Sequence, residues 1–316
     1  MTQKPRLTFI YIAEGPEYQF MAVHLLASLR EHFPKDVRAI GYCPEHTFDQ
    51  IHPGVLKAHE LMGAEIRPMR TEGMWDTPYG HGNKILAALQ PRDSEYSAFV
   101  DSDVLFLKSN SPEELISPGK VSCSMAASML WAPQTIWDDV YGAFDMPVPE
   151  ERLRLMRDRR KAVVPYFSSG LVVFPEGPVD GKRFADVWYD TARILDRVEE
   201  IPKRRPYLDQ ISLPLAIRRA GLDVNILPEE QHYILGGVLR GRPLPEDRDI
   251  RTIHYRGTKI LDEVGKLPYA RKMLKRHTGS RYVRRLAPET ATEDSVSADG
   301  IADTGLAEGG ITDTES

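Results

Sequence analysis

Residues 98–107 of this 316-residue chain read AFVDSDVLFL, so that two carboxylates, Asp101 and Asp103, interrupt an otherwise apolar run. An unpaired buried charge is costly. In an extended segment Asp101 and Asp103 would project to the same side while Ser102 faces away. Two adjacent carboxylates repel each other unless a cation lies between them, and Mg²⁺ or Mn²⁺ suits that place. The stretch therefore predicts a divalent metal site at the C-terminal end of a buried strand, where open α/β sheets bind ligands.

A second Asp-x-Asp pattern serves as an internal control. Asp247 and Asp249 follow GRPLPE at residues 241–246, which is a proline-rich stretch rather than an apolar strand. We expect these two aspartates to lie on a solvated loop. For Asp101 and Asp103 the competing interpretation is a capped turn between a strand and a loop, without a metal.

The first hundred residues alternate short β-rich runs with longer runs of helical period, which is typical of βαβ units on a parallel sheet. The predicted strands are Leu7–Ala13, Val37–Cys43, Glu65–Pro68 and Tyr96–Val100. The predicted helices are Tyr18–Phe33, His46–Met62 with an interruption at Pro53 and Gly54, and Asn83–Leu89.

The alternation becomes less regular after Asp103. Further strands are predicted at Val121–Met125, Leu171–Phe174, Asp223–Leu227 and Ile250–His254. Further helices are predicted at Gln134–Phe144, Arg183–Val198 and Asp209–Ala220. The pattern favours an α/β fold, with a Rossmann-like mixed sheet flanked by helices in a single domain whose second half is elaborated.

The composition is that of a soluble globular protein, with 41% apolar and 28% charged residues. Leu7–Ala13 is too short to span a membrane and lacks a signal-peptide cleavage pattern, so a cytoplasmic location is expected. Cys43 and Cys123 are too few for a disulfide framework or a thiolate metal cluster. No nucleic-acid partner is expected.

The two ends of the C-terminal region differ in charge. Residues 287–316 carry eight acidic and no basic residues, and their composition predicts a disordered tail. Arg271–Arg285 carries seven Lys and Arg residues and no acid. The apolar residues in and beside that basic run are Tyr269, Met273, Leu274, Tyr282 and Val283. Two interpretations stay open: a solvated helix face that the acidic tail neutralises, or peripheral docking on an anionic membrane surface.

Three further stretches follow the Asp-x-Asp strand in a fixed order. They are YFSSGLVVF at Tyr166–Phe174, YLDQISLPLAI at Tyr207–Ile217, and HYRGTK at His254–Lys259. Together with Asp-x-Asp, and across roughly residues 7–260, they resemble the retaining, metal-dependent nucleotide-sugar glycosyltransferases of the glycogenin and lipopolysaccharide-galactosyltransferase kind. The resemblance implies a GT-A fold and glycosyl transfer.

The resemblance also implies a cofactor and a donor. Asp101 and Asp103 would bind Mn²⁺ or Mg²⁺ together with His254, and the nucleotide-diphosphate sugar would most simply be a UDP-sugar. The acceptor would be a glycan, a lipid-linked molecule or a small molecule. A divalent cation bridging the diphosphate stabilises the charge that develops on the leaving group.

By the same resemblance, two residues at the start of a helix would be catalytic. Asp209 would bind hydroxyls of the donor sugar, and Gln210 would lie beneath the anomeric carbon and stabilise an oxocarbenium-like state. Capping of the helix is an alternative reason for Asp209. Ser168, Ser169 and Gly170 would line the sugar pocket.

Nucleotide and phosphate contacts are expected at both ends of the matched region. Asn83 and Lys84 begin a predicted helix, whose N-terminus suits phosphate. The full set of predicted nucleotide-binding residues is Ala13, Glu14, Tyr18, Asn83, Lys84, Ser102, Gly257 and Lys259. Residues 70–81, RTEGMWDTPYGH, show no periodicity and predict a mobile loop that closes over the donor.

The chain departs from the family pattern at three places. Ser168 stands where the family usually carries asparagine, and Ile211 stands where it carries a second aspartate. The final motif is H-x-x-G-x-K, one residue short. Two other functions therefore remain in view: a non-catalytic GT-A-like protein that binds a nucleotide or a glycan, and a haloacid-dehalogenase-type phosphatase, whose Asp-x-Asp start "DSDVL" also fits.

The expected organisation has four parts within the 316 residues. They are a nucleotide-binding half at 1–108, a sugar and acceptor half at 109–260, a basic helical end at 261–286, and the acidic tail at 287–316. The first three would form the glycosyltransferase-like domain, 1–286.

Overall fold

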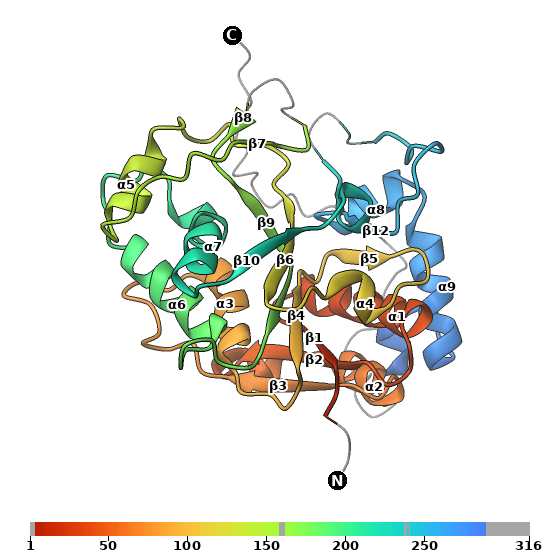
Figure 1. The fold of residues 1–316 in the computed structure, drawn as a ribbon. Coiled ribbons are helices and arrows are strands. Elements are labelled where there is room, and N and C mark those ends of the chain that lie inside the picture. Colours follow the sequence, from red (N-terminus) through yellow and green to blue (C-terminus); the bar gives the residue numbers. More distant parts are fainter. Residues whose placement is uncertain (1–3, 158–161, 237–238, 240, 289–316) are drawn as a thin grey trace.

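The computed structural model describes residues 4–157, 162–236, 239 and 241–288 (Figure 1). Its strands are β1 Leu7–Ile12, β2 Arg38–Pro44, β3 Glu65–Met69, β4 Tyr96–Val100, β5 Val104–Phe106, β6 Lys120–Met125, β7 Leu153–Arg154, β8 Ala162–Val163, β9 Phe167–Pro175, β10 Asp223–Ile226, β11 Tyr233–Ile234 and β12 Thr252–His254. Its α-helices are α1 Tyr18–His32, α2 Pro53–Leu61, α3 Asn83–Leu89, α4 Pro112–Leu115, α5 Ile136–Gly142, α6 Phe184–Leu195, α7 Leu208–Arg219, α8 Thr258–Glu263 and α9 Leu267–Thr278. Its 3₁₀ turns include η1 Glu45–Gln50, η2 Gly80–Gly82, η3 Arg205–Tyr207, η4 Glu229–Gln231 and η6 Val283–Leu286.

A seven-stranded mixed sheet forms the centre of the molecule, in the order β10-β6-β9-β4-β1-β2-β3. The pairs β3–β2, β2–β1, β1–β4 and β6–β10 are parallel, whereas β9 is antiparallel to both β4 and β6. Six strands therefore share one direction. Their C-terminal ends meet at one edge of the sheet, where side chains from distant segments can converge.

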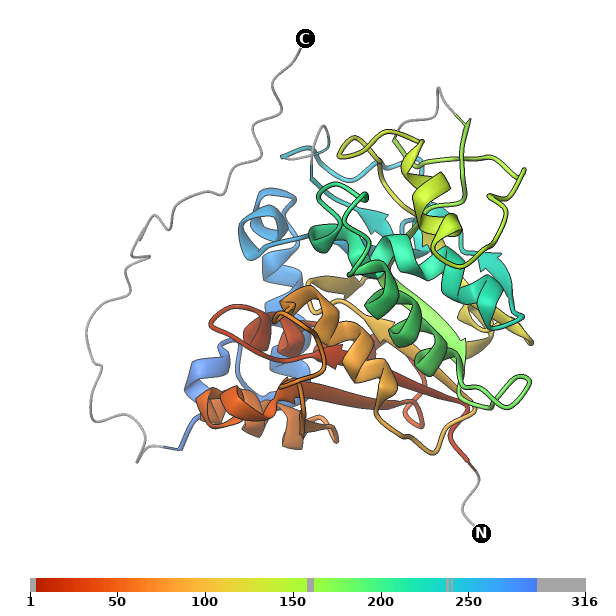
Figure 2. The ribbon, with the colours of Figure 1, turned by 90° about the vertical axis from the view of Figure 1, so that its left-hand side faces the viewer.

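Helices cover both faces of this sheet (Figures 1 and 2). On one face of the sheet, α1, α2 and α9 form a core with side chains of β1 such as Phe9 and Tyr11. On the other face α3, α6 and α7 form a core with side chains such as Ile10 and Phe99. Strands β1, β2 and β4 are buried on both faces over most of their length, which is why they are largely apolar rather than alternating, whereas the edge strand β3 is partly exposed.

A second, three-stranded sheet has the order β11-β12-β5. In the antiparallel pair of β12 and β5, His254 lies opposite Val104 and Ile253 opposite Leu105. The backbone NH of Tyr255 donates to the carbonyl of Asp103 at 2.9 Å. This register brings a segment from near residue 254 directly to the Asp-x-Asp residues.

Most of the predicted elements are present, and two have the predicted bounds. Tyr96–Val100 and Asn83–Leu89 begin and end where the sequence predicted. The helical stretch from His46 divides into η1 and α2 near the predicted interruption. The helix predicted at Gln134–Phe144 is shorter, and β9 starts four residues before the predicted Leu171.

The expectation of an extended backbone at Asp101–Asp103 is wrong. The strand β4 ends at Val100, residues 102 and 103 form a turn, and the NH of Val104 donates to the carbonyl of Asp101 at 3.1 Å. The chain turns here because β4 belongs to the large sheet and β5 to the small one. The carboxylates therefore converge through a turn rather than through the two-residue repeat of a strand.

The segment Arg70–His81 is a loop, as predicted, but it is packed against the protein. The side chains of Trp75 and Tyr79 are each only 7% exposed. The hydroxyl of Tyr189 on α6 donates to the carbonyl of Met74, and Arg205 donates to two further carbonyls of the loop. This packing does not fit the prediction of a mobile loop that closes over a donor.

The basic C-terminal end lies against the first two helices. Met273 and Leu274 on α9 are buried beside α1, and Val283 in η6 is buried beside α2. Tyr282 remains 44% exposed, with Arg271 and Arg285 over its ring. None of the helices in the described residues is both long and apolar enough to cross a membrane. Met273, Leu274 and Val283 of the basic end thus stabilise the fold. The predicted acidic tail lies almost wholly outside the described residues.

Candidate functional site

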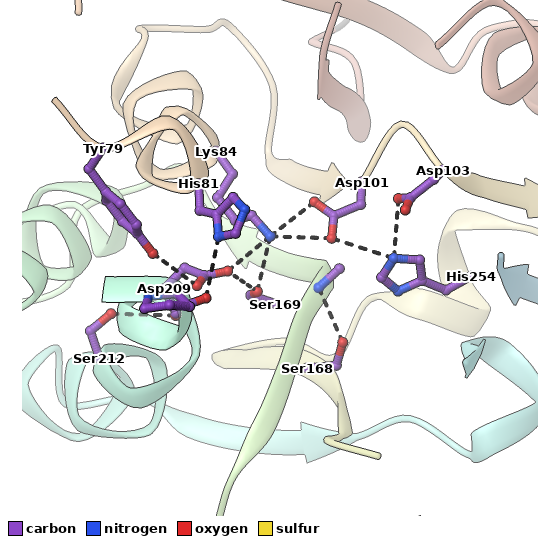
Figure 3. A network of polar contacts seen from close by, with 12 residues as sticks. Tyr79, His81, Lys84, Asp101, Asp103, Ser168, Ser169, Asp209, Ser212 and His254 are labelled. Carbon is purple, nitrogen blue, oxygen red and sulfur yellow. Dashed lines mark hydrogen bonds and ion pairs between the residues drawn. The ribbon is translucent and has the colours of Figure 1, made fainter. Parts of the chain in front are cut away.

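Asp101, Asp103 and His254 converge at the C-terminal end of β4 (Figure 3). The Nε2 atom of His254 lies 3.1 Å from Oδ1 of Asp103 and 3.9 Å from Oδ2 of Asp101. One ligand atom from each residue can be chosen so that all three lie within 4.8 Å of one another. The structure therefore brings together the three residues that the sequence predicted as metal ligands.

Gly170 on β9 packs directly against this cluster. A Cβ atom added to Gly170 on β9 would lie 3.0 Å from Oδ2 of Asp101 and 2.9 Å from Nδ1 of His254. Any side chain at position 170 would therefore press on the cluster. Two carboxylates and one imidazole form a donor set that suits Mn²⁺ and accommodates Mg²⁺. The residues present thus fit a divalent cation.

The three groups alter each other's protonation. Burial acts to raise the pKa of Asp103, but the charge and the hydrogen bond of His254 outweigh it and hold that pKa below its usual value. Burial acts to lower the pKa of His254, but Asp103 and then Asp101 raise it above its usual value. For Asp101, burial dominates the attraction of Lys84 and raises the pKa. The cluster is an acidic site that attracts positive charge.

Lys84, the second residue of α3, links this cluster to Asp209. Its ammonium lies 3.0 Å from Asp101 Oδ1, 2.9 Å from Asp209 Oδ2 and 3.1 Å from Ser169 Oγ. Burial acts to lower the pKa of Lys84, yet the two carboxylates raise it above its usual value, so the side chain is charged. The sequence predicted a phosphate contact for Lys84, whereas the described structure shows it between two carboxylates.

The capping interpretation of Asp209 is wrong. The N-cap of α7 is Tyr207, and that position makes no side-chain capping bond. Asp209 is 3% exposed and accepts hydrogen bonds from Ser169 and from the Tyr79 hydroxyl. Burial acts to raise the pKa of Asp209, but Lys84 and Ser169 hold it below its usual value. Gln210 follows on the same helix and is partly exposed.

The predicted base-binding residues lie after β1. The Asn83 amide donates to both carboxylate oxygens of Glu14, at 3.0 and 3.1 Å. Tyr18 begins α1 and is 51% exposed. Burial raises its pKa first, and Asp103 and Asp101 raise it further, because their charges lie nearby. A side chain of this kind can stack on a ligand that also reaches the acidic cluster.

Two of the residues predicted to contact the nucleotide also form hydrogen bonds within the protein. The backbone NH of Ala13 donates to the carbonyl of Tyr42 at 2.8 Å. The Ser102 hydroxyl donates to the carbonyl of Ile12 and so ties the Asp101–Asp103 turn to β1. These bonds hold the edge of the site in place, which accounts for Ser102 without any ligand.

The last motif follows His254 on the surface. Gly257 is the N-cap of α8 and has an extended backbone, and an added Cβ would meet no heavy atom within 4 Å among the described residues. Lys259 is exposed on α8. Close approach of a phosphate, rather than crowding within the protein, remains the expected reason for Gly257.

Comparison with known proteins identifies the family. The model of the Rhodobacterales glycosyltransferase domain matches residues 9–221, which is most of the chain. The chain belongs to this family. It is therefore a glycosyltransferase, and this assignment replaces both the phosphatase alternative and the alternative of a non-catalytic binding protein.

The predicted GT-A fold is confirmed by a solved glycosyltransferase structure. The apo form of mouse xyloside xylosyltransferase 1 superposes with a TM-score of 0.50 at 11% identity, covering 79% of this chain and 97% of that one. The apo structure of the bifunctional glycosyltransferase WbbM gives a TM-score of 0.46 at 12% identity, covering 87% of this chain and 52% of that one. No curated protein matches the chain.

Sequence reasoning missed one buried residue of this glycosyltransferase. His232 is fully buried between η4 and β11, and its Nε2 lies 3.1 Å from the Ser168 hydroxyl. Its ring centroid lies 5.1 Å from that of His254. Burial, and then the charge of His254, hold its pKa well below the usual value. The stretch EEQHYIL at 229–235 carries no motif, so only the pairing of β11 with β12 reveals the position.

His232 also helps to explain why Ser168 stands where the family usually carries asparagine. The Ser168 hydroxyl faces His232 and also accepts from the backbone NH of Gly170 at 3.3 Å. It therefore holds the backbone of β9 beside the cluster. Ser169, the next residue, is the one whose side chain contacts Lys84 and Asp209.

Proposed function

We propose that this glycosyltransferase is metal-dependent, and that Asp101, Asp103 and His254 hold one Mn²⁺ or Mg²⁺ ion. The observation that carries the proposal is the convergence of the three side chains from β4, the following turn and β12, within 4.8 Å of one another. A divalent cation between the two buried carboxylates would offset their mutual repulsion. The bound ion would act as a Lewis acid toward the diphosphate of the donor.

We further propose a nucleotide-diphosphate sugar as donor, with a UDP-sugar as the first candidate. Tyr18 would stack on the base, and Glu14 would be oriented toward it by Asn83. Gly257 would let the backbone approach the diphosphate, and Lys259 would supply positive charge. The support is that the charges of Asp101 and Asp103 act on Tyr18, and that Gly257 and Lys259 closely follow His254 in the chain.

The sugar would occupy the space between the cluster and the start of α7. Asp209 is held ionised by Lys84 and Ser169, so it can accept hydrogen bonds from sugar hydroxyls. Gln210 would stabilise positive charge at the anomeric carbon, and the transfer would proceed with retention. Ser169 and Gly170 would line the sugar pocket, whereas Ser168 would shape it through the β9 backbone.

For the acceptor we propose a glycan, a lipid-linked molecule or a small molecule, with the protein in the cytoplasm. Peripheral contact with an anionic membrane through residues 271–285 would depend on their seven basic side chains. We retain the division into a nucleotide-binding half (1–108), a sugar and acceptor half (109–260) and a basic end (261–286) as part of the proposal.

A thermal-shift screen tests the metal and the donor together. A ligand that binds only the folded state at about 100 times its Kd stabilises it by roughly 2.7 kcal/mol, or about 5 °C or more here. We expect this shift for a UDP-sugar only when Mn²⁺ or Mg²⁺ is present, together with slow release of UDP. Equal shifts with EDTA would contradict the proposed metal site, and a response to other nucleotides alone would reassign the donor.

A further inference from the structure

The contacts of the Lys84 ammonium raise a question about how the cation enters. Its Nζ atom lies 3.0 Å from Oδ1 and 3.2 Å from Oδ2 of Asp101. Both carboxylate oxygens of one proposed metal ligand are therefore already in contact with a positive charge (Figure 3). The Lys84 side chain is only 12% exposed, so water screens this pair weakly.

The other carboxylate of the cluster differs. Asp103 faces His254, and within the described part of the chain it forms no ion pair with Lys84. On its far side the Lys84 ammonium contacts Asp209 Oδ2 at 2.9 Å and Ser169 Oγ at 3.1 Å. An ammonium group has three donors, and three side chains surround it here. Lys84 is thus shared between a proposed metal ligand and a proposed sugar-binding residue.

We infer that Lys84 is a positioning residue that competes with the divalent cation for Asp101 and is released toward Asp209 when the cation binds. This inference rests on the metal site of the proposed function. The ammonium already contacts both carboxylate oxygens of Asp101, and a divalent cation would approach the same oxygens to about 2.0–2.1 Å, so the two positive charges repel each other there. When the cation takes Asp101, Asp209 and Ser169 remain to hold Lys84.

The competition has a consequence for the donor. A nucleoside diphosphate brings negative charge next to the cation, which gives the displaced ammonium a further partner beside Asp209. Cation and nucleoside diphosphate then bind more tightly together than either does alone, and by linkage each strengthens the other equally. Lys84 would therefore make donor binding the step that completes the metal site.

The test measures Mn²⁺ binding directly, from the electron paramagnetic resonance signal of free Mn²⁺, with and without UDP. In the absence of UDP we expect Lys84→Gln to bind Mn²⁺ about 10-fold more tightly than wild type, since a direct competitor at a buried carboxylate is removed. We expect the gain in Mn²⁺ affinity on adding UDP to shrink in the same variant. Lys108→Gln is the matched control, because Lys108 pairs with Asp249 on the surface.

A double-mutant cycle separates competition from simple charge. We expect Asp209→Asn to weaken Mn²⁺ binding, because Lys84 is then held more firmly by Asp101, and we expect this effect to vanish when Lys84→Gln is also present. If charge acted only through space, Asp209→Asn would weaken Mn²⁺ binding by the same factor in both backgrounds. That result would overturn the inference, as would equal Mn²⁺ affinity of wild type and Lys84→Gln.

Folding of the variants is checked by far-UV circular dichroism. Lys84→Gln leaves two buried carboxylates without their cation, whereas the double variant removes a charge of each sign and keeps hydrogen-bonding groups. If Lys84→Gln does not fold, the double variant must still bind Mn²⁺ more tightly than Asp209→Asn, and a failure to do so overturns the inference. Wild-type protein that binds no Mn²⁺, with or without UDP, would instead refute the proposed metal site itself.

Discussion

The chain contains two Asp-x-Asp patterns, and the structure gives them opposite surroundings. Asp101 and Asp103 have side chains that are 21% and 10% exposed, and they meet His254 and Lys84. Asp249 has a 71% exposed side chain, and its partner Lys108 is itself half exposed. The hydrogen bond from Lys108 lowers the pKa of Asp249, but water screens this pair. The two pairs thus have the same sequence pattern, but His254 and Lys84 converge only on Asp101 and Asp103.

The difference comes from where each pattern lies along the fold. Asp101 follows β4, which lies in the middle of the seven-stranded sheet, and β12 pairs with β5, the strand that comes directly after the Asp101–Asp103 turn. Asp247 and Asp249 follow a proline-rich loop before β12. An Asp-x-Asp pattern that follows a central strand thus lies at the sheet edge where ligands bind and where other side chains can converge on it.

The largest expected effect comes from the matched pair Asp103→Asn and Asp249→Asn. We expect Asp103→Asn to reduce metal-dependent turnover by about 1,000-fold or more, because a charged ligand of the ion is lost. Asp249→Asn should leave turnover unchanged. Release of UDP from a UDP-sugar measures both. Equal loss in the two variants would remove the distinction between the two patterns.

The next largest effect concerns His254. We expect His254→Gln to weaken Mn²⁺ binding by roughly 100-fold while the protein remains folded, since the nitrogen ligand is lost but the two carboxylates stay. Isothermal titration with Mn²⁺ gives the affinity, and circular dichroism verifies the fold. Unchanged Mn²⁺ affinity would show that β12 does not contribute to the ion site.

The pH dependence of Mn²⁺ binding sharpens the same comparison. Asp103 raises the pKa of His254 above its usual value, and a metal ligand must be neutral, so binding releases a proton. Mn²⁺ affinity should therefore fall by up to about tenfold per pH unit as the pH drops below that raised pKa. In the metal-free protein the pH dependence of folding stability has the opposite sign. The Asp103–His254 ion pair stabilises the fold at pH values below the pKa that His254 has in the unfolded chain. This contribution is lost as the pH rises through the higher pKa that His254 has in the folded protein.

Titrations with Mn²⁺ at several pH values measure the pH dependence of Mn²⁺ affinity. Urea unfolding of the metal-free protein at the same pH values measures the pH dependence of folding stability. The His254→Gln variant is the control, because it should lose both dependences. A Mn²⁺ affinity that stays constant across the raised pKa of His254 would contradict the proposed ligand role.

A smaller effect is expected at Gly170. The Cβ of Gly170→Ala would lie 2.9 Å from nitrogens of His232 and His254, so we expect about 1–3 kcal/mol of destabilisation and weaker Mn²⁺ binding. Gly177→Ala is the control, because an added Cβ there meets no heavy atom within 4 Å among the described residues. Thermal unfolding with and without Mn²⁺ compares them. If both variants match wild type in thermal stability and in Mn²⁺ binding, an added Cβ at position 170 does not disturb the acidic cluster.

Much of this architecture could be predicted from the sequence because the parallel half follows strong local rules. Tyr96–Val100 is a short apolar run between turn signals, and Asn83–Leu89 has helical period. The residues of the acidic cluster could also be predicted, since Asp101 follows a strand and His254 ends one. The turn at Asp101–Asp103 could not, because it arises where the chain passes from one sheet to another.

Other features depend on contacts between distant segments. The burial of Trp75 and Tyr79 comes from packing against α6 and η3, which no local pattern in Arg70–His81 specifies. His232 and the sharing of Lys84 likewise appear only when β9, α3 and α7 are placed together. The Asp-x-Asp pattern and the family resemblance pointed to the residues of the site, and the packing of distant segments determined their partners.

The most direct test of the central claim is an anomalous difference map, recorded at the manganese absorption edge from a crystal of the full chain grown with Mn²⁺ and UDP. The proposed site predicts one strong peak within about 2.0–2.4 Å of oxygens from Asp101 and Asp103 and of Nε2 of His254. A map with no peak at these three residues, or with its peak at Asp247 and Asp249, would contradict the account.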